Sequence, residues 1–347
     1  MRIEGKKLVH RFVDSGFLWP LVALAFLLCY NLLFTPNFFH LEIKEGHLFG
    51  SLVDIFNRGA PSILMAIGMT LVIATGGIDI SVGSILAISG AIASVLIASF
   101  HAPLWIVVGV PLLVALLLGA WNGMLVAVVG TQPIISTLIL MVAGRGIAQL
   151  ITDGQIVVFE YKPFEFIGGG FFLGLPFSIS LIILVGLSVF LITKRTSLGL
   201  FIEAVGCNPT ASRYAGVNDR MIKMIVYIIS GLCAGIAGLI ICADIKAADA
   251  NNAGLFSEMD AILSVAIGGT SMNGGKFSVA GSIIGGLVIQ SLTTTIITKG
   301  IPVEYTLVVK SLVIVTVFLL QSEEFRRMFT AKKRNLTRST VIRGEHI

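Results

Sequence analysis

The sequence predicts an all-α protein that crosses a membrane many times, as one bundle of about ten helices. Hydrophobic residues make up 56% of the 347 residues, charged residues make up 12%, and the mean hydropathy is +0.96. Soluble domains carry roughly 25% charged residues, so this composition excludes that class. The apolar runs approach ~20 residues, the length at which a helix spans ~30 Å of hydrocarbon, whereas a membrane barrel would show ~10-residue alternating strands.

Ten apolar segments are expected to be helices within a single transmembrane domain that covers residues 1–347. They are 17–35, 61–75, 82–99, 103–129, 133–151, 177–193, 222–245, 258–268, 279–296 and 305–320.

Two of these segments are too short to cross the hydrocarbon. Segments 61–75 and 258–268 would be about 22 Å and about 16 Å long at ~1.5 Å per residue. Each runs into a Gly-Gly pair, so we expect broken or re-entrant helices near 76–84 and 268–278. Re-entry would lower the number of crossings from ten toward eight.

The Lys and Arg residues predict the orientation. Alternating the crossings places 17 of them on one side, in the tail 1–16, the stretch 193–223 that contains the loop 194–221, Lys276 and the tail 322–347, and five on the other. Basic residues favour the cytoplasmic side, so both termini and the loop 194–221 are expected there. Because these residues gather at the tails and one loop, and not along an aromatic-lined groove, no nucleic-acid partner is expected.

No catalytic or metal-binding pattern is found in the sequence. The Cys and His residues lack zinc spacing, and there is no G-x-S-x-G elbow. The segment 269–276, GTSMNGGK, resembles a phosphate-binding loop, but its spacing is one residue too long and Phe277 replaces the hydroxyl that would bind magnesium. The chain is therefore expected to bind no cofactor and to be no enzyme, and any ATP and Mg²⁺ would be bound by a partner.

Few polar residues occur within the apolar segments. The candidates for a substrate pathway or its gate are Asp79, Ser81, Ser84, Asn122, Arg145 and Gln149. For Asp79 and Ser81 two interpretations stay open: the ends of broken helices face the pathway in transporters, whereas residues just before a helix can also cap it. For Arg145, lining the pathway and pairing with a helix-end carbonyl or a carboxylate are both open.

The outer loop after residue 245 is the most polar one. It contains Asp249, Asn251 and Asn252, which fit either an ordinary solvated loop or a docking edge for an external partner.

Three motifs resemble those of the permease subunits of ribose-type sugar ABC importers. They are AIGMTLVIATGGIDISVGS at 66–84, GLFIEAVGCNPTASRYAGV at 199–217 and DAILSVAIGGTSMNGGKFSVAGSIIGG at 260–286. Segments 137–157 and 243–256 are most similar to those of galactofuranose permeases, so the resemblance implies galactofuranose as the sugar. An ion-coupled secondary transporter using Asp79 and Asp260, or a permease for another sugar, are the alternatives.

The resemblance also implies partners and a place in the cell. It implies a multi-pass protein in the lipid of the bacterial inner membrane, a second permease subunit of the same or a related chain, a cytoplasmic ATPase and a periplasmic sugar-binding protein. In this family the loop 194–221 holds the helix that couples to the ATPase. The residues that the motif assigns to it are Glu203, Ala204, Gly206, Asn208, Ala211 and Gly216.

Overall fold

The computed structural model describes residues 18–35, 38–40, 42–44, 47–302, 305, 307–312, 315 and 316. The predicted tails 1–16 and 322–347 lie outside these residues. The chain divides into one unit of Met1–Thr295 and a second of Ile296–Ile347. In the second unit, the described residues 305, 307–312, 315 and 316 of the predicted last helix are helical.

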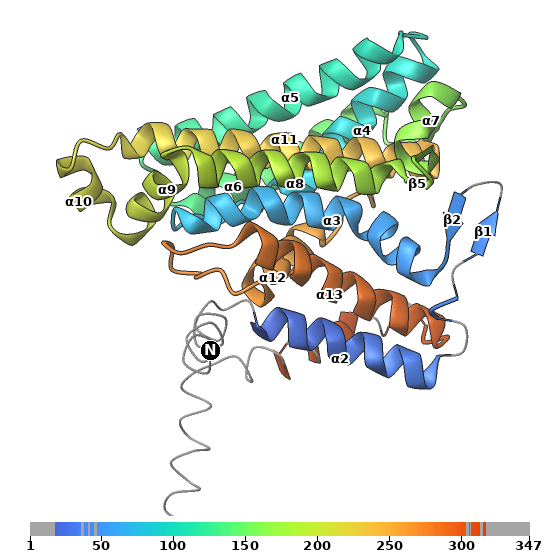
Figure 1. Ribbon diagram of the computed structural model, residues 1–347. Coiled ribbons are helices and arrows are strands. Elements are labelled where there is room, and N and C mark those ends of the chain that lie inside the picture. The colour runs from blue at the N-terminus through green and yellow to red at the C-terminus, as the bar shows by residue number, and fades with distance from the viewer. Residues whose placement is uncertain are drawn as a thin grey trace, which may run out of the picture. The chain divides into compact units, whose positions relative to one another are not determined.

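Helices build nearly all of the first unit (Figure 1). The longer ones are α2 (Leu18–Phe34), α3 (Ser51–Ala74), α4 (Val82–Ala98), α5 (Leu104–Met124), α6 (Pro133–Ile151), α8 (Phe177–Arg195), α11 (Asp219–Ile245) and α13 (Val279–Thr298). The shorter ones are α7 (Lys162–Gly169), α9 (Leu198–Cys207), α10 (Pro209–Tyr214) and α12 (Ser257–Ile267), and α5 continues into a π-helix, η1 (Leu125–Val129).

Among the described residues, three short antiparallel strand pairs lie in the connections. The strands are β1 (Glu42–Lys44), β2 (His47–Phe49), β3 (Val157–Val158), β4 (Phe171–Phe172), β5 (Leu175–Pro176) and β6 (Ala247–Ala248). The pairs β1–β2 and β4–β5 are hairpins. The pair β3–β6 joins the connection after α6 to the connection after α11, because Val157 faces Ala248 and Val158 faces Ala247.

Within the described residues, six helices are long and apolar enough to cross a membrane: α3, α5 with η1, α6, α8, α11 and α13. The shorter apolar helices include α2 and α4. The chain is therefore a helical, multi-pass membrane protein, as the composition predicts.

The predicted start of α3 was wrong. We expected a helix from residue 61 with Pro61 in its first turn, but α3 begins at Ser51 and Pro61 lies inside it. The turns before Pro61 are amphipathic: Ile55 and Gly59 are buried, whereas Asp54 and Arg58 are exposed. The charged residues therefore lie on the exposed face of these turns and are compatible with a helix that begins before Pro61. With 24 residues, α3 is about 36 Å long and is not a short helix.

The core of this unit lies around α3 and α11. From Gly59 to Ala74 nearly every residue of α3 is buried, and α11 contacts α3, α4 and α5. A Cβ on Gly231 of α11 would lie 2.5 Å from the carbonyl oxygen of Ala115 in α5, so the two backbones pack directly against each other. The centre of α11 is thus closely packed, and the polar residues described next lie beside it.

Candidate functional site

A buried polar cluster fixes the break between α3 and α4. The chain is not α-helical from Thr75 to Ser81, at the place where the sequence predicts a break. Asp79 is fully buried, and one of its carboxylate oxygens accepts hydrogen bonds from the backbone nitrogen (3.1 Å) and hydroxyl (2.6 Å) of Ser81. The other oxygen accepts one from the Ser230 hydroxyl of α11 (2.8 Å). Three donors therefore satisfy a carboxylate that burial would otherwise strongly destabilise.

The same cluster reaches α5 and α6. The side-chain amide of Asn122 donates to the Ser81 hydroxyl at 2.8 Å, and Ser84 donates to the carbonyls of Ser81 (2.8 Å) and of Leu140 in α6 (3.2 Å). Four of the predicted pathway residues thus come together in one place. Ser230 was not predicted, because a lone serine in an apolar helix is not a sequence signal.

The position of Ser230 gives the depth of the cluster. It lies eleven residues after the first residue of α11, or about 16 Å along a helix of 27 residues. The non-helical segment before α4 therefore reaches the middle of the bundle.

Arg145 and Gln149 of α6 hold a second non-helical segment, residues 249–256. The guanidinium group of Arg145 donates to the carbonyl oxygens of Ala253 (2.6 Å) and Gly254 (2.8 Å). The side chain of Gln149 donates to Asn251 at 2.8 Å. Arg145 therefore pairs with two carbonyls, although these precede α12 and do not end a helix, and its place along a pathway stays a prediction. We name these three hydrogen bonds the α6 clamp.

The predicted docking residues belong to the same segment. Asp249 accepts hydrogen bonds from the side chain of Asn252 (2.7 Å) and from the backbone nitrogens of Asn251 (3.0 Å) and Asn252 (3.3 Å). These bonds, led by that from the Asn252 side chain, lower the pKa of Asp249. Asn251 and Asn252 are exposed. The loop that contains Asp249 is therefore a hydrogen-bonded turn that presents two amides to solvent.

Replacing Arg145 with glutamine is expected to loosen residues 249–256, because the carbonyls of Ala253 and Gly254 lose their charged donor, an effect of about 1.5–3 kcal/mol for such a bond. Hydrogen exchange of the amides in 250–257 should become roughly tenfold faster or more. Gln149→Ala is the matched comparison: it removes one bond between exposed groups and should change exchange much less. Equal effects of both variants would show that Arg145 does not hold this segment.

The segment 268–278 is not helical and separates α12 from α13, at the place where the sequence predicts a break. It is a turn at the ends of α3 and α9. The backbone nitrogen of Gly275 donates to the carbonyl oxygen of Ala74, the last residue of α3, at 2.8 Å. A Cβ on Gly206, near the end of α9, would overlap both the Ala74 oxygen and the Gly275 nitrogen. Ala74, Gly206 and Gly275 thus form a contact of three backbones, which we call the glycine junction.

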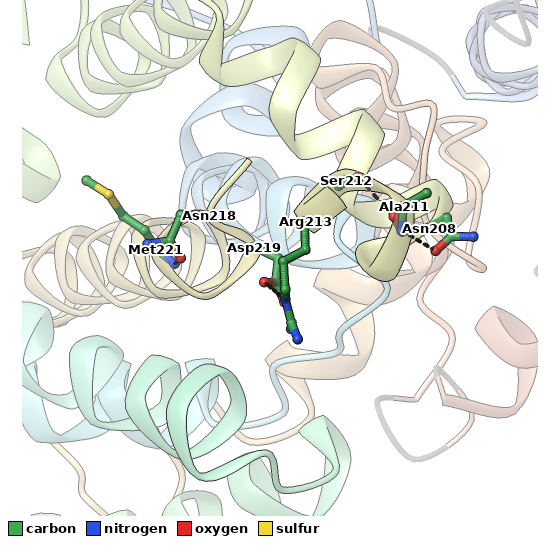
Figure 2. A network of polar contacts seen from close by, with 7 residues as sticks. All are labelled: Asn208, Ala211, Ser212, Arg213, Asn218, Asp219 and Met221. Carbon is green, nitrogen blue, oxygen red and sulfur yellow. Dashed lines mark hydrogen bonds and ion pairs between the residues drawn. The ribbon is translucent and has the colours of Figure 1, made fainter. Parts of the chain in front are cut away.

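The predicted coupling stretch, residues 203–216, lies in the two short helices α9 and α10 and the turn after them, and hydrogen bonds fix its ends (Figure 2). Asn208 caps α10 by accepting a hydrogen bond from the nitrogen of Ala211 at 3.0 Å, and Asn218 caps α11 through Met221 at 3.1 Å. Arg213 makes two 2.9 Å bonds to the carboxylate of Asp219, which raise the pKa of Arg213. These bonds give the stretch a defined shape.

The six coupling candidates lie at different depths in this stretch. Asn208, Ala211 and Gly216 are exposed, whereas Glu203, Ala204 and Gly206 are half-buried. Gly216 has a φ of +86°, which favours glycine there. Tyr214 is 89% exposed and Leu200 is 67% exposed. The stretch offers a surface on one side and contacts the glycine junction on the other. In the described part of the chain, no three His, Cys, Asp or Glu side chains lie close enough together to hold a metal ion.

Comparisons with known proteins agree with one another. A family model described as the branched-chain amino acid transport system permease component matches residues 51–318. The galactofuranose transporter permease protein YtfT of Escherichia coli (strain K12) is 50% identical over 315 residues, which cover 89% of this chain and 92% of that protein.

Two further relatives are other sugar permeases. The fructose import permease protein FruF of Bifidobacterium longum is 38% identical over 96% of this chain and 95% of its own. The ribose import permease protein RbsC of Escherichia coli (strain K12) is 34% identical over 88% of this chain and 93% of its own. No solved structure matches the chain significantly.

Proposed function

Because this chain belongs to the permease family described as the branched-chain amino acid transport system component, among its sugar importer members, we propose that it carries galactofuranose through the bacterial inner membrane. It is a transport component and not an enzyme. The single observation that supports galactofuranose is the 50% identity to YtfT, which spans 92% of that protein. The fructose and ribose permeases are less similar, at 38% and 34%.

The coupling stretch is proposed to bind a cytoplasmic ATPase, which would hold the ATP and Mg²⁺. Its exposed residues would contact the ATPase. The glycine junction would then transmit the movement, because it joins α9 directly to the end of α3 and to the turn that precedes α13. The α3 end leads within five residues to Asp79. A shift of the coupling stretch would therefore move the buried cluster without any intervening flexible side chain.

The polar residues are proposed to act at two levels of the pathway. Asp79, Ser81, Ser84 and Asn122 would form a gate in the middle of the bundle, and Arg145 with Gln149 would form its outer part. Asp249, Asn251 and Asn252 would dock the periplasmic sugar-binding protein, because they lie at the end of α11 opposite the coupling stretch. A second permease subunit would complete the assembly, with both termini in the cytoplasm.

Reconstitution tests this function. The chain is placed in liposomes with its ATPase, its sugar-binding protein and any paired permease, and uptake of radiolabelled galactose is measured with ATP. We expect uptake only with the complete set and ATP. Uptake by the chain alone under an ion gradient would instead show an ion-coupled transporter. ATP-driven uptake of ribose or fructose in preference to galactose would correct the sugar.

A further inference from the structure

The first turns of α4 and α12 meet inside the bundle. Gly83 is the second residue of α4, and Glu258 is the second residue of α12. A Cβ on Gly83 would overlap the Oε2 atom of Glu258, and it would lie 2.7 Å from the carbonyl oxygen of Gly254. Two helix N-termini therefore point at one place, and the Glu258 carboxylate lies between them.

Glu258 is a buried carboxylate with unused hydrogen-bonding capacity. Its side chain is 4% exposed, and Oε2 has no hydrogen-bond partner among the described residues. A buried, unsatisfied carboxylate oxygen is strongly unfavourable, and folded proteins keep few of them. The two helix N-termini supply positive potential beside this carboxyl group. The Oε2 atom of Glu258 is thus a buried acceptor that remains available.

Arg145 lies close by but does not neutralise Glu258. Its guanidinium group would be 3.3 Å from the same Cβ position on Gly83. It donates instead to Ala253 and Gly254, and no ion pair joins it to Glu258 in the part of the chain that the structure describes. The α6 clamp therefore holds this segment next to Glu258, and the Glu258 Oε2 atom has no hydrogen-bond partner among the described residues.

The α6 clamp also connects Glu258 to the surface. Gln149 and Asn251 are exposed, Arg145 is half-buried, and Glu258 is buried. These polar groups follow one another from solvent to the middle of the bundle. Opening the clamp would expose Glu258 along a route that polar groups already line.

We propose that Glu258 is a sugar-binding residue of the transport pathway, which accepts hydrogen bonds from the hydroxyl groups of the passing monosaccharide. The inference rests on the proposed function. An ionised carboxylate only accepts hydrogen bonds, and its two oxygens suit neighbouring hydroxyl groups. The backbones of Gly83 and Gly254 pack closely around it, so these segments must separate before a sugar ring can reach the carboxyl group. A single acid gives a contact that is specific and still reversible, as transport requires.

The first test compares uptake by variants of the complete reconstituted importer, supplied with ATP and galactose-loaded binding protein. Glu258→Gln keeps the shape but removes the charge, and should lower galactose uptake about tenfold, the effect of losing one charge-assisted hydrogen bond. Asp260→Asn is the matched control, because it removes an acid from the same first turn of α12; its uptake should stay near the wild-type rate. Wild-type uptake by Glu258→Gln would overturn the inference.

The second test separates recognition from a structural role. Uptake of galactose and of its 2-deoxy, 3-deoxy and 6-deoxy analogues is measured at concentrations that saturate the binding protein. If Glu258 binds one hydroxyl, the wild type should transport the analogue lacking it about tenfold more slowly, and Glu258→Ala should no longer distinguish that analogue from galactose. A uniform slowing of all four sugars by Glu258→Ala would show a structural role and overturn the inference.

Failure of the proposed function itself gives a different result. If the wild-type assembly transports no sugar with ATP, the function is wrong and the variants are not needed to show it. If Glu258→Ala does not assemble, the comparison of analogues is made with Glu258→Gln, which preserves the volume of the side chain.

Discussion

Replacing Gly206 with alanine is expected to abolish sugar uptake while the ATPase of the complex continues to hydrolyse ATP. The added Cβ would overlap the carbonyl oxygen of Ala74 and the nitrogen of Gly275, both of which are backbone atoms that cannot rotate away. The 2.8 Å hydrogen bond between Gly275 and Ala74 would have to break or lengthen. Overpacking of this kind costs about 1–3 kcal/mol or more. The measurement is ATP hydrolysis and uptake in the same liposomes.

Gly109→Ala is the control for Gly206→Ala. Gly109 also lies in a helix, α5, but a Cβ there meets nothing within 4 Å. That variant should gain up to about 1 kcal/mol of stability from the better helix propensity of alanine and should transport normally. Normal coupling of hydrolysis to uptake in Gly206→Ala would mean that the glycine junction does not transmit the movement of the ATPase.

Asp79→Ala is expected to reduce folding, assembly and transport together. The substitution leaves the Ser81 nitrogen, the Ser81 hydroxyl and the Ser230 hydroxyl without their acceptor in a fully buried place. Breaking such a buried network costs about 3–5 kcal/mol. The measurements are the thermal stability of the purified complex and its uptake rate. Loss of uptake with normal stability and assembly would show instead that Asp79 acts in the proposed gate without being needed for the fold.

A double-mutant cycle sharpens the Asp79 prediction. Ser230→Ala alone removes one of the three donors and should cost about 1–2 kcal/mol. Added to Asp79→Ala, it removes a donor that would otherwise be orphaned, so the double variant should be more stable than the sum of the two single effects predicts. Strict additivity would show that the two side chains act independently.

The sequence predicted the positions of most helices because long apolar runs with clear ends leave little choice. α6 begins and ends where expected, and α4 differs by one residue at its end. The start of α3 was missed because Pro61 resembles a first-turn proline, and because burial of Ile55 and Gly59 beneath exposed charges depends on neighbouring helices. Such tertiary contacts override local signals.

The site was predicted only where its residues are close in sequence. The short length of α12 indicates a helix that does not span the membrane, but not which of its ends lies inside. The Gly-Gly pair at 268 marks the C-terminal end of α12, whereas the buried acid Glu258 lies at its N-terminal end. The partners of Asp79 and of Gly83 lie in other helices, at Ser230 and Glu258, and a single sequence does not predict which helices will pack together.

The glycine junction is made of main-chain atoms, whereas the face of the coupling stretch that carries Tyr214 is made of exposed side chains. If the coupling stretch binds an ATPase as proposed, affinity for that ATPase and transfer of its motion would be encoded in different parts of the chain. Exchanging the side chains of that face would let the permease bind a different ATPase, while the backbone contacts of the glycine junction would stay unaltered. The same separation would let permeases of this type share an ATPase, or change to another one, during evolution, provided that Gly206 is kept.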